Sequence, residues 1–225
     1  KEALRRCIEH LRPSVDDVLE NPREGNILSQ LVEAHREQAA PLDHDAILNL
    51  AAGLLVAGYE TTSWTLAGTL AALLLHPDSL ARIRNDRSLL MPAVEEAMRW
   101  CSSVVVLPRV VLAETVVCDR PIAAGSVVML CFSSSHYDEA LHANPEVYAI
   151  DRNPEHLNFG GGPHSCLGAP LARMEARIGL SALLDSAPHV RLDPAERPMF
   201  LLGAQGSAMY GPDSLRVLLS PDPAA

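Results

Sequence analysis

A glycine-rich loop in the C-terminal half of the chain carries a single cysteine just before a predicted helix. The segment reads Phe-Gly-Gly-Gly-Pro-His-Ser-Cys-Leu-Gly from Phe159 to Gly168, and its thiol belongs to Cys166. Glycines leave space around the sulfur, so that backbone can approach a planar partner closely. A thiol near a helix N-terminus ionises more readily, because the helix dipole stabilises the thiolate. The pattern favours a thiolate ligand for a large, flat cofactor.

Two other interpretations of Cys166 are weaker. A free cysteine in a structural turn would not need Phe159, His164 and four glycines in fixed positions around it. A zinc site would need further ligands at short spacing, which the sequence does not provide.

The spacing Phe-x-x-Gly-x-His-x-Cys-x-Gly, followed by Ala-Pro-Leu-Ala-Arg, resembles the haem-binding signature of bacterial cytochrome P450 monooxygenases. The resemblance implies a mainly α fold with small β-sheets (α+β), of which this chain forms the C-terminal portion. It also implies haem b, with its iron ligated by the Cys166 thiolate. The cofactor-binding residues of the loop would be Phe159, Gly160, His164, Cys166 and Gly168, with His164 bound to a haem propionate or, in the simpler interpretation, capping local backbone.

A second motif, Ala-Gly-Tyr-Glu-Thr-Thr from Ala57 to Thr62, lies in a long apolar segment. Ala57 and Thr61 are four residues apart and share a helix face. A threonine hydroxyl can bond to the carbonyl of residue i−4 and open the helix locally, while Gly58 leaves space beside it. With Glu60 adjacent to the hydroxyl, the motif predicts a narrow pocket that has a proton route.

This hexapeptide resembles the oxygen-binding segment of the same family. The resemblance implies that Thr61 orients iron-bound oxygen and water and that Glu60 relays protons, with Ala57 and Gly58 against the cofactor. The alternative is an ordinary mid-helix threonine pair beside a solvated glutamate.

Glu96 and Arg99 are three residues apart on a predicted helix, which alone indicates a surface pair of about 0.2–0.5 kcal/mol. Their order in the chain resembles the Glu-x-x-Arg pair that holds the connection before the cysteine loop. An arginine in that connection usually completes the network, but Val147 occupies the aligned position. We therefore expect a weakened network, unless Arg152 substitutes.

Other roles follow from the resemblance alone. Arg109 would bind a haem propionate through its forked guanidinium, or be a solvated residue at a strand edge. Residues 103–107 and 206–210 would lie beside a hydrophobic substrate. Arg173 and Arg177 would be docking charges for an electron donor, or residues of a solvated helix face.

The elements that must position these residues follow from hydrophobic periodicity and turn signals. Helices are predicted at 2–19, 25–37, 46–75, 78–85, 92–100 and 169–185, with breaks at Pro13 and at Asn21-Pro22. Strands are predicted at 104–111, 115–118 and 126–132, with turns at 119–121 and 123–125, and further short strands between 189 and 219. Residues 133–158 are predicted to be mostly irregular, and the helix after the cysteine loop is expected to bury Leu171, Met174, Ile178 and Leu183.

We expect one domain over residues 1–225. Its parts would be a helical region (1–100), strands with an irregular connection (101–158), the cysteine loop with its helix (159–185) and C-terminal strands (186–225). The apolar run 46–75 is long enough to span a bilayer. Glu60 within it favours a helix buried in a soluble core or lining a cavity instead.

Composition limits the function classes. A chain of 225 residues that is 48% hydrophobic can bury a sizeable core, and a formal net charge of −10 argues against a nucleic-acid surface. Five scattered cysteines suit a reducing compartment, hence the cytoplasm. The chain begins at Lys1 without a signal peptide or membrane anchor, and its length indicates a fragment or a truncated relative of the family.

The resemblance implies a haem-thiolate monooxygenase that inserts one oxygen atom from dioxygen into a small apolar organic substrate. Electrons would come from a separate ferredoxin or flavodoxin-type donor, because the sequence contains no reductase-like nucleotide motif. One alternative is a truncated, non-catalytic haem-binding protein. Another is a peroxide-using relative, in which the acid-alcohol pair of Glu60 and Thr61 would be altered.

Overall fold

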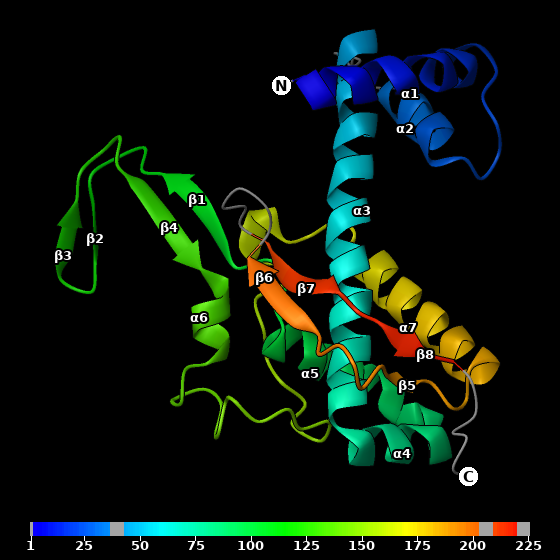
Figure 1. Ribbon diagram of the computed structural model, residues 1–225. Helices are drawn as coiled ribbons and strands as arrows, with labels where there is room; N and C mark the ends of the chain where they lie inside the picture. Colours follow the sequence, from blue (N-terminus) through cyan, green and yellow to red (C-terminus); the bar gives the residue numbers. More distant parts are fainter. Residues whose placement is uncertain (1, 37–42, 203–208, 220–225) are drawn as a thin grey trace. The chain divides into compact units, whose positions relative to one another are not determined.

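The structure, a computed structural model, describes residues 2–36, 43–202 and 209–219 (Figure 1). It is mainly helical with small two-stranded sheets, as predicted. The helices are α1 (Glu2–Glu20), α2 (Ile27–Arg36), α3 (His44–Leu75), α4 (Pro77–Asn85), α5 (Leu90–Trp100), α6 (Phe132–His136) and α7 (Ala169–Ser186), with 3-10 turns η1 (Arg87–Leu89) and η2 (Gly162–His164). The strands are β1 (Val106–Val110), β2 (Thr115–Val117), β3 (Arg120–Ile122), β4 (Val127–Cys131), β5 (Arg191–Leu192), β6 (Met199–Leu202), β7 (Tyr210–Ser214) and β8 (Val217–Leu218).

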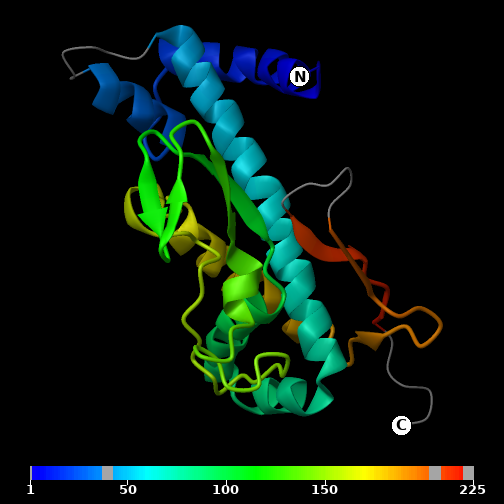
Figure 2. The ribbon, with the colours of Figure 1, turned by 90° about the vertical axis from the view of Figure 1, so that its left-hand side faces the viewer.

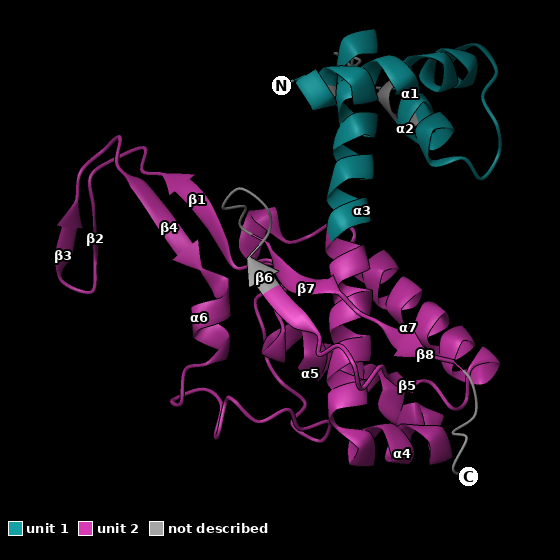
Figure 3. Cartoon of the chain, in the orientation of Figure 1, with its two compact units in different colours: residues 1–60 teal, residues 61–225 magenta. Residues whose placement is uncertain are grey.

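The chain has two compact units, residues 1–60 and 61–225 (Figure 3). The expectation of a single domain stays a prediction. In the first unit, apolar side chains of α1, α2 and the beginning of α3 form a small core of Val15, Val32, Ile47, Leu48 and Ala51. The predicted break at Pro13 is wrong, because α1 continues through it. Pro13 is exposed, so water can satisfy the carbonyl that loses its helical partner.

Helix α3 confirms the predicted long helix but not its continuous burial. Residues 53–60 are exposed, whereas Ala71, Ala72 and Leu73 are fully buried in the second unit. None of the helices in the described part of the chain combines the length and apolarity required to cross a membrane.

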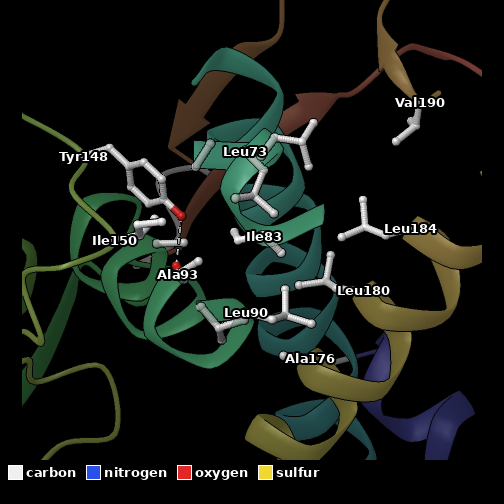
Figure 4. Close-up of a cluster of buried hydrophobic side chains, with 14 of the residues drawn as sticks. Leu73, Ile83, Leu90, Ala93, Tyr148, Ile150, Ala176, Leu180, Leu184 and Val190 are labelled. Carbon is white, nitrogen blue, oxygen red and sulfur yellow. Dashed lines mark hydrogen bonds between the residues drawn. The ribbon is translucent and has the colours of Figure 1, made fainter. Parts of the chain in front are cut away.

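The core of the second unit is formed by α4, α5, α7 and the end of α3 (Figure 4). Figure 4 shows Leu73, Ile83 and Leu180 converging in this core, and the Tyr148 hydroxyl donates to the Ala93 carbonyl at 3.0 Å. Because Tyr148 lies outside any helix, this bond ties the irregular connection to α5.

The predicted buried face of α7 is wrong for three of its four residues, whereas Leu183 is half-buried against the core. Leu171, Met174 and Ile178 are 46%, 46% and 55% exposed, and the buried residues are Ala176, Leu180 and Leu184. The predicted and the observed buried residues both have helical spacing, and the prediction chose the set with the larger apolar side chains. The small Ala176 is fully buried in the core that α7 shares with α5, which the periodicity of large apolar side chains does not reveal.

An extended hairpin follows α5. β1 pairs with β4 antiparallel, from Val106 opposite Cys131 to Val110 opposite Val127. The β2–β3 hairpin continues from their ends, as Figures 1 and 2 show. Its turn is Cys118-Asp119, both with positive φ, so the predicted turn at 119–121 is wrong by one to two residues.

After α6, the connection to the cysteine loop has no regular element from residue 137 to 161, in agreement with the predicted irregular segment. The predicted C-terminal strands are also confirmed, as β5 pairs with β8 and β6 with β7. The segment bearing the cysteine must therefore be positioned by side-chain anchors.

Candidate cofactor-binding site

The cysteine loop closes on itself through backbone hydrogen bonds. The Cys166 N–H donates to the Phe159 carbonyl at 2.8 Å, and the Ser165 N–H donates to the Gly162 carbonyl at 3.1 Å. Gly160 and Gly162 have φ values of +65° and +64°, which side chains rarely adopt. A Cβ at Gly160 would also lie 3.4 Å from the His164 carbonyl oxygen. The loop thus brings Phe159, Gly160, His164 and Cys166 together as predicted. Its backbone conformation accounts for the glycines at positions 160 and 162.

Cys166 is exposed and immediately precedes α7. The Ala169 N–H bonds to the Cys166 carbonyl at 3.3 Å, and Pro170 lies in the first turn, where its missing N–H costs no helical bond. A Cβ at Gly168 would meet only the Cys166 sulfur, at 3.8 Å. The loop thereby leaves the thiol accessible.

The chemistry of the donors fits a cofactor with one protein ligand. Across residues 2–36, 43–202 and 209–219, no group of three or more His, Cys, Asp or Glu side chains could hold a metal ion. An accessible thiol just before a helix N-terminus fits a thiolate ligand of haem iron.

The two residues predicted to bind the haem propionates, His164 and Arg109, lie in separate elements. His164 is exposed in η2. Arg109 is half-buried on β1, where its guanidinium donates to the neighbouring Pro108 carbonyl at 2.9 Å and not to the cysteine loop. Their binding to propionates stays a prediction.

The α3 motif is placed on a continuous α-helix. Ala57, Gly58 and Glu60 are exposed and Thr61 is half-buried. The local opening of the helix at Thr61 and the proton relay stay predictions.

Glu96 and Arg99 are fully buried, so the surface-pair interpretation is wrong. The Arg99 guanidinium donates to both Glu96 carboxylate oxygens at 2.9 Å. Its remaining N–H groups bind the backbone carbonyls of His136 (2.9 Å), Pro145 (2.7 Å) and Val147 (3.2 Å). The pair anchors the irregular connection to α5.

Arg152 completes this network, which confirms the alternative that it substitutes for the arginine expected at Val147. Its guanidinium donates to Glu96 Oε1 at 3.0 Å and to the carbonyls of Ala143 (2.7 Å), Asn144 (3.1 Å) and Val147 (3.0 Å). Val147 participates only through its backbone oxygen, which its side chain does not determine. The segment is irregular, so a residue five positions further along reaches the carboxylate.

Glu95, the neighbour of Glu96, forms a second set of contacts that sequence reasoning missed. It accepts hydrogen bonds from Arg173 at 2.6 and 2.9 Å and from His156 Nε2 at 2.9 Å. Desolvation alone would raise the pKa of Glu95, but the bonds from His156 and Arg173 outweigh it and lower the pKa to about 2. Arg173 is therefore paired with an acid of the same chain, whereas Arg177 is exposed, and docking of an electron donor by either arginine stays a prediction.

His136, at the end of α6, is buried and neutral. Its Nε2 accepts the Leu157 N–H at 2.8 Å, which requires an unprotonated nitrogen. Desolvation lowers the pKa of His136 to about 4, helped by nearby His156, Arg99 and His142 and opposed by an interaction of the imidazole with the Arg99 backbone.

The two segments predicted beside the substrate lie next to each other where they are described. The Tyr210 N–H donates to the Ser103 carbonyl at 3.1 Å, and Val104 forms an antiparallel bridge with Met209. Residues 206–208 of that prediction lie outside the described residues.

These features define a class of protein. It has a mainly α fold in which a glycine-rich loop presents one accessible cysteine thiol. Glu95 and Glu96 of α5 hold the segments that flank this loop. A family model described as "Cytochrome P450" matches residues 1–189. The chain belongs to the cytochrome P450 family.

Named relatives agree with this assignment. The chain is 48% identical over 197 residues to "C-19 steroid 1alpha-hydroxylase" of Sorangium cellulosum, a match that covers 87% of this chain and 49% of the relative. It is 38% identical over 170 residues to "Steroid C26-monooxygenase" of Mycolicibacterium smegmatis, which covers 75% and 41%. The solved structure of Sorangium cellulosum So Ce56 cytochrome P450 260B1 matches with a TM-score of 0.85 at 39% identity, over 97% of this chain and 55% of that one. The chain thus spans about half the length of the curated relatives it matches.

Replacing Arg152 tests the corrected network. Arg152→Met leaves the Glu96 carboxylate underpaired in the interior, and we expect the free energy of unfolding to fall by about 3–5 kcal/mol in denaturant titrations. Val147→Ala serves as the control, with a loss below about 1 kcal/mol, because the Val147 side chain is 48% exposed and only its backbone is bound. Equal losses in the two variants would contradict the assignment of Arg152.

The buried, neutral state of His136 predicts that the folded protein loses stability in acid. Its pKa is 6.5 when unfolded and about 4 in the folded protein, so the unfolded state binds more protons between these values. The contribution of neutral His136 to the free energy of unfolding is complete above pH 6.5. It is lost as the pH falls to 4, and the total loss is about 3 kcal/mol. Chemical unfolding at several pH values measures it. His136→Gln, which keeps an acceptor but does not titrate, should flatten this dependence, and an unchanged slope would refute the role of His136.

Proposed function

We propose that this chain carries the haem-thiolate centre of a monooxygenase that inserts one oxygen atom from dioxygen into a small apolar organic substrate. The observation that supports this most strongly is the accessible Cys166 thiol, on a glycine loop whose flanking segments are held by Glu95 and Glu96. Membership of the cytochrome P450 family supports the same reaction class.

Haem b bound through iron to Cys166 would supply the activation of dioxygen, which amino-acid side chains do not provide. The chain's own residues would do the rest. Cys166 binds the iron as a thiolate, Arg109 and His164 hold the propionate carboxylates, and the glycines of the loop leave room for a flat ring. Thr61 orients oxygen and water by hydrogen bonding, and Glu60 delivers protons to that hydroxyl.

The substrate is apolar. The names of the relatives include a steroid 1α-hydroxylase and a steroid C26-monooxygenase, so steroids are the first substrate class to test. The described part of the proposed substrate wall is residues 103–107, Met209 and Tyr210, in which Ser103 and Val104 pair with Tyr210 and Met209. We place the protein in the cytoplasm, with a ferredoxin or flavodoxin-type electron donor, without a membrane or nucleic-acid partner.

Complete activity requires further polypeptide, equivalent to the rest of the relatives' length. Exposed apolar residues of α7, Leu171, Met174 and Ile178, support this proposal. So does a neighbouring open groove of about 310 Å³ between α3 and α7, which is lined by Ser63, Leu66, Ala67, Leu70, Gly179, Leu180, Leu183 and Leu215. Apolar surface of this kind is ordinarily covered by another element.

The competing function, a non-catalytic haem-binding protein, loses one of its two supports because Arg152 compensates for Val147. The other support, the length of chain that the relatives have in addition, is unaffected. A peroxide-using relative would be expected to alter the acid-alcohol pair, which Glu60 and Thr61 retain.

The absorption spectrum of the reduced, carbon monoxide-bound protein tests the proposal. With haem supplied to the chain, we expect a strongly red-shifted Soret band in the wild type and in Cys131→Ser, which removes another exposed thiol. We expect the band to be lost in Cys166→Ser. A wild type without the band, or a band that persists in Cys166→Ser, would refute thiolate ligation by this residue. Dioxygen-dependent consumption of NAD(P)H with surrogate electron donors then separates a catalyst from a scaffold.

A further inference from the structure

Glu95 and Glu96 are adjacent on α5 but hold different parts of the chain. Glu96 binds Arg99, Arg152 and the Ala149 N–H, all within α5 or the connection that follows the hairpin. Glu95 instead binds His156, shortly before the cysteine loop, and Arg173, near the start of α7. One acid therefore anchors the connection, and the other anchors both flanks of the cysteine loop.

Arg173 connects Glu95 to the loop itself. Its guanidinium carbon lies over the Phe159 ring, 4.4 Å from the centroid, in the geometry of a cation–π contact. The backbone carbonyl of the same Phe159 accepts the Cys166 N–H at 2.8 Å. The contacts run from Glu95 to Arg173, then to Phe159, and from its backbone to Cys166.

His156 strengthens the opposite flank. Its side chain is 3% exposed, its Nε2 bonds to Glu95, and its ring centroid is 5.9 Å from that of Phe159. Arg173 and His156 therefore both contact the Phe159 ring while they share one carboxylate. A bidentate arginine-carboxylate pair fixes orientation as well as distance.

We propose that Glu95 is a positioning residue for the cysteine loop, acting through Arg173 and Phe159 and independently of the Glu96 network. This inference rests on the proposed function, because the atom that Glu95 positions is the sulfur proposed to bind iron. Glu95 itself does not touch the reacting atoms.

The partial exposure of the pair separates a positioning role from a purely stabilising one. The side chains of Glu95 and Arg173 are 25% and 40% exposed, so water compensates for much of the pair when it is broken. Loss of Glu95 should therefore loosen the loop more than it destabilises the whole chain. Amide hydrogen exchange measures the two effects separately, because it reports opening peptide by peptide.

The test compares Glu95→Gln with the wild-type full chain by hydrogen–deuterium exchange and mass spectrometry. Glutamine has the same shape, but one carboxylate oxygen becomes a donor and can no longer accept. We expect amides in residues 157–168 to exchange about tenfold faster, with α5 unchanged. Arg173→Lys, which keeps the charge but loses the fork and the stacking, should give an intermediate increase.

The matched control is Asp185→Asn, which removes an acid bound to Arg87 at 2.7 Å near the other end of α7. It should leave exchange in residues 157–168 unchanged. Unchanged loop exchange in Glu95→Gln, or an equal increase throughout the chain, would overturn the positioning role.

This readout needs no haem, so it is independent of the proposed function. A faster-exchanging loop in a chain that fails the carbon monoxide test would retain the positioning role and refute the haem-thiolate assignment. With haem bound, the fraction of haem that does not give the red-shifted Soret band should also be larger in Glu95→Gln than in Asp185→Asn. Equal fractions in the two variants would contradict a role at the iron ligand.

Discussion

The buried carboxylate of Glu96 is the constraint on which the path of the connection before the cysteine loop depends. A carboxylate without solvent is costly unless it is paired and hydrogen-bonded, and this one accepts four hydrogen bonds, two from Arg99 and one each from Arg152 and the Ala149 N–H. The arginines in turn bind five backbone carbonyls of the connection between them. One buried charge thus determines the path of a segment that has no regular secondary structure.

Helix α5 has a similar role beyond Glu96. The Trp100 indole donates to the Glu146 carbonyl at 2.9 Å, and the Tyr137 hydroxyl donates to the Trp100 carbonyl at 2.6 Å. The Asn158 side chain donates to the Met98 carbonyl at 2.5 Å, just before the cysteine loop. In this irregular segment, hydrogen bonds from side chains replace the backbone ladders of strands and helices.

The sequence was sufficient for most elements and for the loop, because both depend on local signals. The glycines near Cys166 indicate backbone conformations that other residues rarely adopt. The helix after Cys166 follows from the periodicity of its apolar residues. The failures include Pro13 inside α1, the buried face of α7 and the turn of the second hairpin. Alignment by position identified Val147 and offered Arg152 only as an alternative, because linear spacing does not encode the path of an irregular connection. Glu95 was missed since its partners, His156 and Arg173, are distant in the sequence and carry no motif with it.

Iron K-edge X-ray absorption of the haem-loaded chain tests most directly whether this anchored thiol is the ligand. We expect a sulfur atom in the first coordination shell of the iron in the wild type, and only nitrogen or oxygen ligands in Cys166→Ser. A wild-type spectrum without sulfur, or one in which the sulfur persists after Cys166 is replaced, would contradict the assignment of Cys166 as the ligand that the acids of α5 hold in place.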